Sequence, residues 1–274
     1  MSAAILGCGY VGTAVAHRWA AQDITITATT TRPQRVKDLQ AVANQVRVVV
    51  GTDQEAMVDL IRPQAVLLMA VGAGRQASYT ETYLNTAKTL VKALNQAPGL
   101  QHIIFTSTFS IYGDYGGAWV TEADPLRPAT PNAEVMAATE QVLLAAATPD
   151  RQVCILRLGG IYGPGRELAH IYSRAAGTTR PGQGHEASNW IHLSDIVGAI
   201  DFARHHSLNG VFNLVQDEIP TVAELMDRVC HTHGLTPVQW DPTQPSARPY
   251  NVRVANQKLK NAGYLFKHPA FTDI

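Results

Sequence analysis

The segment Ile5-Leu6-Gly7-Cys8-Gly9-Tyr10-Val11-Gly12 decides the fold of this chain. It has the pattern G-x-G-x-x-G, follows a short apolar run and opens a segment with helical periodicity. In such a strand–turn–helix unit the first glycine permits the sharp turn, the second lets a pyrophosphate approach the backbone, and the third allows the helix to pack on the strand. The phosphates then lie at the helix N-terminus, where N–H groups and the dipole favour an anion. The segment therefore predicts a dinucleotide cradle, with a glycine-rich turn that binds no ligand as the alternative.

The composition indicates a cytoplasmic protein. The 274 residues include 22 Lys plus Arg and 22 Asp plus Glu, so the formal net charge is zero and nucleic acid is not expected as the main partner. The three cysteines form neither a metal-ligand spacing nor an even disulfide framework, so we expect a reducing compartment and no metal. The chain enters its first strand without a basic leader, and no apolar run approaches the roughly 18 residues of a membrane span. We therefore expect a soluble protein with no membrane partner.

Short, β-branched apolar runs alternate with helical patterns along the chain. Runs apolar on both faces indicate parallel strands covered by helices, and right-handed crossovers join such strands. The pattern therefore predicts a doubly wound α/β fold, a Rossmann fold of about seven strands. We expect a dinucleotide-binding domain at 1–160 and a smaller C-terminal substrate lobe at 161–274 whose elements return to the sheet. The runs are at 3–6, 24–29, 46–50, 65–71, 102–106, 153–158 and 211–215.

Periodicity and capping residues place three helices. Residues 80–96 carry an apolar stripe at helical spacing, and Thr130-Pro131 opens a helix that runs to about residue 147. The capping box Thr221-Val222-Ala223-Glu224 opens the third helix, and Gly234 ends it. The segment 177–189 has three glycines and no apolar periodicity, so we expect a loop that is mobile without ligand.

Hydroxyl and guanidinium groups follow the second predicted strand, in Thr29-Thr30-Thr31-Arg32-Pro33-Gln34-Arg35. A ribose 2′-hydroxyl normally meets an acidic side chain here, and the segment has none. Arg32 beside Thr30 suits a 2′-phosphate instead, because guanidinium binds phosphate in a fork geometry. We therefore predict NADP as the cofactor, with NAD as the alternative. The alternative for Arg32 and Arg35 is that both are solvated loop charges.

The segment F-T-S-T-F-S-I-Y-G-D at 105–114 resembles the S-S-x-x-V-Y-G segment of extended short-chain dehydrogenases/reductases, the NAD-dependent epimerase/dehydratase family. The resemblance continues in L-R-L-G-G-I-Y-G-P-G at 156–165 and W-I-H-L-S-D-I at 190–196. It extends to G-V-F-N at 210–213 and K-L-K-N-A-G-Y at 258–264. This ordered set covers nearly the whole chain. It implies an NAD(P)-binding oxidoreductase that acts on a small carbonyl, alcohol or sugar-like substrate.

The resemblance also implies roles for individual residues. Thr108 matches the family's catalytic Ser/Thr, which hydrogen-bonds the reacting oxygen of the substrate, and Ser107 is expected to be structural. The turn that contains Gly160 is expected near the nicotinamide, and a looser match puts Asp53 near the adenine. The other residues expected along the cofactor are Gly7, Gly9, Tyr10, Val11, Gly12, Thr30, Arg32, Ala70, Val71 and Thr106.

The chain departs from the family pattern on the helix that follows Thr108. Family members carry Y-x-x-x-K there, and the ammonium lowers the pKa of the phenol, which exchanges a proton with substrate. Alignment puts Asn132 and Met136 at these two positions, and neither side chain can perform that role. The chain therefore resembles an atypical branch of the family that lacks this dyad. The candidates that remain for proton transfer are Tyr112, Tyr162 and His192, with a structural role as the alternative for His192.

Two functions stay open at this point. The first is an NADP-dependent oxidoreductase in which Thr108 orients the substrate. The second is a catalytically deficient protein that binds NADP(H) as a sensor or partner-binding module. The family resemblance also makes a homodimer plausible, in which the helices at 80–96 and 131–147 form a four-helix bundle.

Overall fold

A computed structural model describes residues 1–74 and 77–271, and its centre is a seven-stranded parallel sheet. The strand order is β11-β7-β5-β4-β1-β2-β3. Each predicted apolar run forms one of these strands, so the prediction of a doubly wound α/β fold is confirmed. The strands are β1 (Ser2–Leu6), β2 (Thr25–Thr30), β3 (Gln45–Val48), β4 (Val66–Met69), β5 (His102–Thr108), β7 (Gln152–Leu158) and β11 (Gly210–Leu214).

The strand order reverses at β1, which pairs with β2 on one side and with β4 on the other. Ala3 is in register with both Ile26 and Val66. In an open parallel sheet, ligands bind beyond the carboxyl ends of the strands at such a reversal. The glycine segment follows β1 directly, so the sheet topology puts it at this point.

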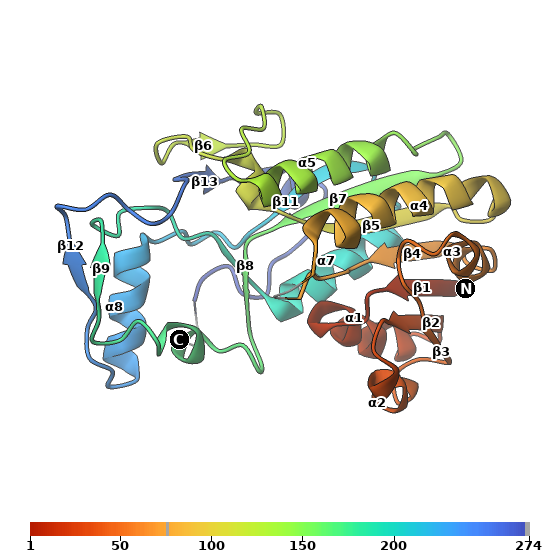
Figure 1. The fold of residues 1–274 in the computed structure, drawn as a ribbon, viewed down its shortest axis with the longest axis horizontal. Helices are drawn as coiled ribbons and strands as arrows, with labels where there is room; N and C mark the ends of the chain where they lie inside the picture. The colour runs from red at the N-terminus through yellow and green to blue at the C-terminus, as the bar shows by residue number, and fades with distance from the viewer. Residues whose placement is uncertain (75–76, 272–274) are drawn as a thin grey trace. The chain divides into compact units, whose positions relative to one another are not determined.

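Helices cover both faces of the sheet. Figure 1 shows α4 and α5 on one face and α1 and α7 on the other. On the second face, Arg18 Nε of α1 donates to Asp201 Oδ2 of α7 at 3.1 Å. Within residues 1–74 and 77–271, no helix is long and apolar enough to cross a bilayer. The helices are α1 (Tyr10–Ala20), α2 (Val36–Gln40), α3 (Gln54–Ile61), α4 (Thr86–Ala93), α5 (Pro131–Leu144) and α7 (Leu193–His205).

Two of the predicted helices differ in detail from their expected form. The segment 80–96 is not one regular α-helix, because it opens with a π-helical stretch at Thr80–Asn85 and closes with a 3-10 turn at Leu94–Gln96. The Thr86 hydroxyl donates to the Glu81 carbonyl, five residues earlier, at the junction of the wide turn with α4. Helix α5 starts at Pro131 as predicted but ends at Leu144, three residues before the expected end.

The chain divides into two compact units. The first contains Met1–Thr108, Pro131–Leu156 and Val197–Phe212, and the second contains Phe109–Thr130, Arg157–Ile196 and Asn213–Ile274. The chain passes between the two units several times. The expected boundary near residue 160 lies close to only one of these passages, the one after Leu156.

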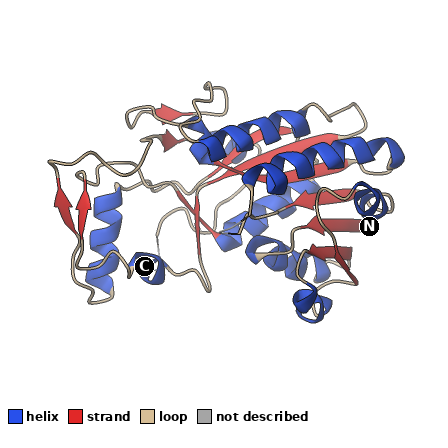
Figure 2. Cartoon of the chain, in the orientation of Figure 1, coloured by secondary structure: helices blue, strands red, loops and turns tan. Residues whose placement is uncertain are grey.

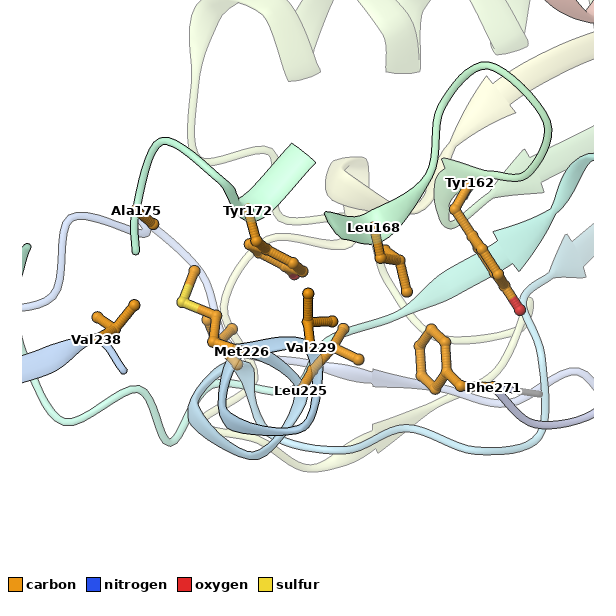
Figure 3. Close-up of a cluster of buried hydrophobic side chains, with 10 residues drawn as sticks. Tyr162, Leu168, Tyr172, Ala175, Leu225, Met226, Val229, Val238 and Phe271 are labelled. Carbon is orange, nitrogen blue, oxygen red and sulfur yellow. The ribbon is translucent and has the colours of Figure 1, made fainter. Parts of the chain in front are cut away.

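The second unit is built from short strand pairs and a helical core. Its pairs are β6 (Trp119–Val120) with β13 (Arg253–Val254), β8 (Gly160–Tyr162) with β10 (Trp190–His192), and β9 (Thr179–Pro181) with β12 (Gln239–Asp241). Figure 3 shows Leu225 and Val229 of α8 (Val222–Thr232) facing Leu168 and Tyr172 of α6 (Leu168–Tyr172). The predicted capping box at Thr221 opens α8, with both of its hydrogen bonds present.

The segment 177–189 is not the unstructured loop that the sequence suggested. It contains β9, which lies beside β12 (Figure 2). Main-chain bonds hold both ends, from Gly177 N–H to Thr236 O at 3.0 Å and from Ser188 N–H to Pro220 O at 2.8 Å. Ser188 is fully buried. The sequence pattern did not predict β9, because the segment is rich in glycine and a strand of three residues is too short to show an alternating apolar pattern.

Candidate functional site

The three glycines of the loop after β1 are present for different reasons. Gly7 has φ +88°, and a Cβ there would lie 2.6 Å from the Val71 Cα. A Cβ on Gly12 would lie 2.7 Å from the Gly7 carbonyl oxygen. Gly9 has φ −88°, and a Cβ there would meet no atom within 4 Å. The fold therefore requires Gly7 and Gly12, whereas the open space above Gly9 fits a ligand that approaches the backbone.

Helix α1 begins directly after Gly9. Gly9 is the N-cap residue and has no side chain with which to cap the helix. The first turn of α1, which lies wholly in the described part of the chain, contains no acidic residue. The first N–H groups of a helix lack intrahelical acceptors and carry the positive end of its dipole. Together these features suit an anion, and the loop fits the pyrophosphate of a dinucleotide.

The end of β2 supports the loop with buried threonines. Thr29 Oγ1 accepts from Gly7 N–H at 2.9 Å, and the Thr29 carbonyl accepts from Cys8 N–H at 2.9 Å. Thr30 Oγ1 accepts from Arg32 N–H at 3.1 Å, so this predicted cofactor contact also fixes the turn that follows it. These bonds hold the glycine loop against the neighbouring strand.

Arg35 reaches the glycine loop, and sequence reasoning missed this contact. Arg32 is exposed and precedes a 3-10 turn at Pro33–Arg35, which folds the chain back toward β1. The half-buried Arg35 then donates from Nη1 to the Cys8 carbonyl at 2.7 Å. Burial raises the pKa of the Cys8 thiol, and the Arg35 charge opposes that rise. The cation fixed beside the loop is thus Arg35 rather than Arg32.

Other predicted residues of the first unit lie at the carboxyl ends of neighbouring strands. Ala70 and Val71 follow β4, and Ala70 N–H donates to Leu6 O at 2.9 Å. Thr106 Oγ1 of β5 donates to Met69 O at 3.4 Å, and Thr108 is the last residue of β5. The sheet thus gathers these residues at the edge that carries the glycine loop.

Asp53 has a role in the fold. It is the N-cap residue of α3, and its Oδ1 accepts from Ala56 N–H at 3.0 Å. An N-cap of this kind typically stabilises a helix by about 1 kcal/mol. The looser family match at Asp53 therefore falls on a residue whose presence the helix already explains.

Helix α5 presents no tyrosine and no lysine. Of the residues at the expected dyad positions, Asn132 is exposed and Met136 is buried. Ser107 donates from Oγ to Glu140 Oε1 at 2.5 Å, and both residues are buried. This pair joins β5 to α5, which agrees with the structural role expected for Ser107.

Tyr112 is a core residue of the second unit and a poor proton donor. It is fully buried, its hydroxyl donates to Asn213 Oδ1 at 2.8 Å, and it accepts from Arg157 Nη1 at 2.8 Å. Burial raises the pKa of Tyr112 to about 12. These contacts favour a structural role for Tyr112 over proton transfer, because the hydroxyl completes a buried polar network.

Gly160 and Tyr162 also belong to the second unit and pack within it. A Cβ on Gly160 would lie 2.8 Å from the Trp190 ring, so packing alone requires this glycine. Tyr162 is 3% exposed, and its hydroxyl donates to Gln216 Oε1 at 3.0 Å. Its ring lies next to Phe271 in the apolar cluster of Figure 3. The burial of Tyr162 disfavours it as a proton donor to substrate.

His192 belongs to a polar cluster with Ser194, Asp195 and His268. The two imidazole rings stack with centroids 3.9 Å apart and planes 31° apart, and both Nδ1 atoms lie within 3.0 Å of Ser194 Oγ. One ligand atom each from His192, Asp195 and His268 lies within 4.8 Å of the others, a spacing at which such groups could hold a metal ion. Sequence reasoning missed His268, because only the fold brings the C-terminal segment to the start of α7.

Comparisons with known proteins agree with this architecture. A family model described as "NAD dependent epimerase/dehydratase family" matches residues 3–214. Protein YeeZ of Escherichia coli K12 is 29% identical over 245 residues, which cover 86% of this chain and 85% of YeeZ. A functionally unknown conserved protein from Silicibacter pomeroyi superposes with TM-score 0.79 at 22% identity, over 98% of this chain and 94% of that one. The Thermus thermophilus UDP-glucose 4-epimerase in complex with NAD gives 0.78 at 22% identity, over 97% and 94%. The two structural likenesses show the fold.

Proposed function

The chain belongs to the NAD dependent epimerase/dehydratase family, and on this premise we propose that it is an NADP-binding oxidoreductase. It transfers a hydride to or from a small carbonyl, alcohol or sugar-like substrate. The observation that carries the proposal is the open space at Gly9, the N-cap residue of α1, where no side chain caps the helix. A glycine that its own protein does not require is readily explained by the approach of a ligand.

Residues of the first unit hold the cofactor in this proposal. The loop Gly7, Gly9, Tyr10, Val11 and Gly12 binds the pyrophosphate through main-chain N–H groups, as in dinucleotide-binding folds generally. Ala70, Val71 and Thr106 line the path from the loop to the end of β5. Gly160 enters only through the family resemblance.

The preference for NADP rests on the charge beside the loop. The sequence contains no acidic residue between Asp23 and Asp38, the region in which NAD enzymes hold a ribose 2′-hydroxyl. Arg35 is anchored to the Cys8 carbonyl, so its charge is fixed beside the loop before any ligand arrives. We therefore assign the main 2′-phosphate contact to Arg35, with the exposed Arg32 as a secondary contact.

Bound nicotinamide supplies the hydride acceptor or donor. Thr108, at the end of β5, is the residue that orients the substrate oxygen. Because α5 offers Asn132 and Met136 where the family has its dyad, the usual proton relay is missing. Loss of such acid–base assistance typically lowers rates by about 10²–10⁴. Turnover of sugar nucleotides by the family mechanism should therefore be very slow.

The same departure supports a second candidate function. A protein that binds NADP(H) without turnover needs the glycine loop and the phosphate contacts but no proton relay. Asn132 and Met136 are compatible with such a sensor or partner-binding protein. The difference between the two functions lies in catalysis and not in binding.

Calorimetry and kinetics together test both candidates. We expect NADPH to bind more tightly than NADH. Arg35→Ala should weaken NADPH binding by about 1.5–3 kcal/mol and leave NADH nearly unchanged, whereas Arg32→Ala should do less. Oxidation of NADPH is then followed with a panel of aldehydes, ketones and keto-sugars. Tight binding without turnover favours the sensor, and a wild type that prefers NADH contradicts the NADP assignment.

A further inference from the structure

Three side chains of the second unit form a set with the composition of a metal site. His192 lies in β10, Asp195 lies in the first turn of α7, and His268 lies in the C-terminal segment. One ligand atom from each lies within 4.8 Å of the others. All three residues belong to one compact unit. The set therefore combines two imidazole nitrogens with one carboxylate oxygen, which are ligand types of zinc.

The carboxylate of Asp195 keeps one lone pair for a ligand. Asp195 is fully buried. Its Oδ1 accepts from Lys267 N–H at 2.7 Å and from the Tyr264 hydroxyl at 3.2 Å, which uses both lone pairs of this oxygen. Its Oδ2 accepts from His268 N–H at 2.9 Å, and its other lone pair faces His268 Nδ1 at 3.1 Å. Oδ2 is therefore the oxygen that a metal ion can share with this imidazole.

The spacing of these atoms fits a coordination sphere. Tetrahedral zinc binds imidazole nitrogen and carboxylate oxygen at about 2.0–2.2 Å, so neighbouring ligand atoms lie about 3.3 Å apart. The 3.1 Å between Asp195 Oδ2 and His268 Nδ1 is close to this separation. The limit of 4.8 Å on the whole set lies about 1.5 Å above it. Movement of side chains alone can therefore close the set around an ion.

The two imidazoles are held beside each other by their neighbours. The ring centroids of His192 and His268 are 3.9 Å apart. Ser194 Oγ lies 2.8 Å from His192 Nδ1 and 3.0 Å from His268 Nδ1. The Tyr162 ring packs on His192 in edge-to-face geometry, with centroids 5.1 Å apart. Hydrogen-bonded neighbours of this kind orient metal-binding side chains, so the set has the outer partners that a metal site needs.

The donor set favours a divalent transition metal over magnesium or calcium. Magnesium and calcium take oxygen ligands, whereas imidazole suits zinc and its neighbours in the first transition row. The His268 side chain is 22% exposed and that of Asp195 is 0% exposed, so the set reaches solvent at the imidazole and ends at a dry carboxylate. The sequence predicted no metal because its cysteines have no ligand spacing, and this set uses no cysteine.

We propose that His192, Asp195 and His268 bind one divalent transition-metal ion, for which zinc is the fitting metal. Asp195 Oδ2, His268 Nδ1 and one ring nitrogen of His192 are the ligands. When the ion binds, the neutral His268 ring carries its hydrogen on Nε2, so that the Nδ1 lone pair faces the metal. Three protein ligands leave the fourth tetrahedral position for water. The ion joins β10, the start of α7 and the C-terminal segment, and this role is independent of dinucleotide binding.

The first test measures zinc affinity on the whole protein after treatment with a chelator and dialysis. Calorimetric titration with zinc chloride should show one ion per chain. Loss of a hydrogen-bond partner of a metal ligand typically costs about 10–100-fold in affinity, which is the loss expected for Tyr264→Phe. His268→Gln and His192→Gln remove ligands and should each cost more than Tyr264→Phe. His231→Gln, at an exposed position on α8, is the matched control and should keep the wild-type affinity.

The second test identifies the ligands. X-ray absorption at the zinc edge should show nitrogen and oxygen at about 2.0–2.2 Å and no sulfur at about 2.3 Å. Zinc should raise the unfolding temperature of the wild type and leave that of His268→Gln unchanged, and circular dichroism checks that the variant is folded. The proposal is overturned by a folded wild type that binds no zinc, by wild-type affinity in His268→Gln, by a sulfur ligand, or by an equal loss in His231→Gln.

Discussion

The substitution Gly9→Ala tests whether Gly9 is required for ligand binding, whereas Gly7 and Gly12 are required for folding. The added Cβ meets no atom within 4 Å, and φ of −88° lies outside the left-handed region that disfavours alanine. The free energy of unfolding without ligand should therefore change by less than about 1 kcal/mol. The same methyl group occupies the space in which a pyrophosphate would approach the main chain.

The expected loss in binding follows from the hydrogen bonds at stake. A bond from a main-chain N–H to a charged phosphate is worth about 1.5–3 kcal/mol. If the Cβ on Gly9 displaces the phosphate enough to break one such bond, affinity for NADPH should fall about 10- to 100-fold. Because the pyrophosphate is common to both cofactors, NADH should lose affinity by a similar factor.

Gly12→Ala is the control for this experiment. Its Cβ would lie 2.7 Å from the Gly7 carbonyl, so the helix must shift from the strand at a cost of typically 1–3 kcal/mol in stability. Calorimetric titration with NADPH gives the affinities, and circular dichroism gives the unfolding temperatures without ligand. Wild-type affinity in Gly9→Ala would refute the argument. So would a Gly9→Ala protein that unfolds as early as Gly12→Ala, since Gly9 would then be structural.

Three further predictions concern stability and assembly. Tyr112→Phe removes the buried hydroxyl that bonds Asn213 and Arg157, so it should lower the free energy of unfolding by about 1–3 kcal/mol in urea titrations and leave the Kd for NADPH unchanged. Burial, aided by the Arg204 charge, lowers the pKa of His102 to about 4. Below about pH 6.5 the unfolded chain therefore binds a proton at His102 that the folded chain does not bind, and the free energy of unfolding should fall by about 3 kcal/mol as the pH drops from about 6.5 to 4. His102→Gln should remove this contribution to the pH dependence of stability. The expected dimer through α4 and α5 should give twice the chain mass in light scattering at micromolar concentration, and a monomer mass would contradict it.

Local physics made most of the fold predictable. Strands that are buried on both faces have continuous apolar runs that can be recognised in the sequence, and all seven predicted runs form strands of the central sheet. The capping box at Thr221 and the start of α5 at Pro131 use chemistry confined to four neighbouring residues, so the sequence contains the whole signal. The short strand β9 was missed because three residues show no period. The π-helical opening of 80–96 was missed because the apolar residues of this segment fit the spacing of a regular helix in the sequence.

The site was less predictable because its contacts depend on turns and on distant segments. Spacing favoured Arg32 for the 2′-phosphate, as the first cation after β2. The 3-10 turn that begins at Pro33 instead carries Arg35 back to the Cys8 carbonyl and leaves Arg32 exposed. A proline next to the expected cation predicts a turn, and such a turn can bring the next cation toward the loop. No comparable local signal exists for His268, which is 73 residues from Asp195, so that contact could only come from the structure.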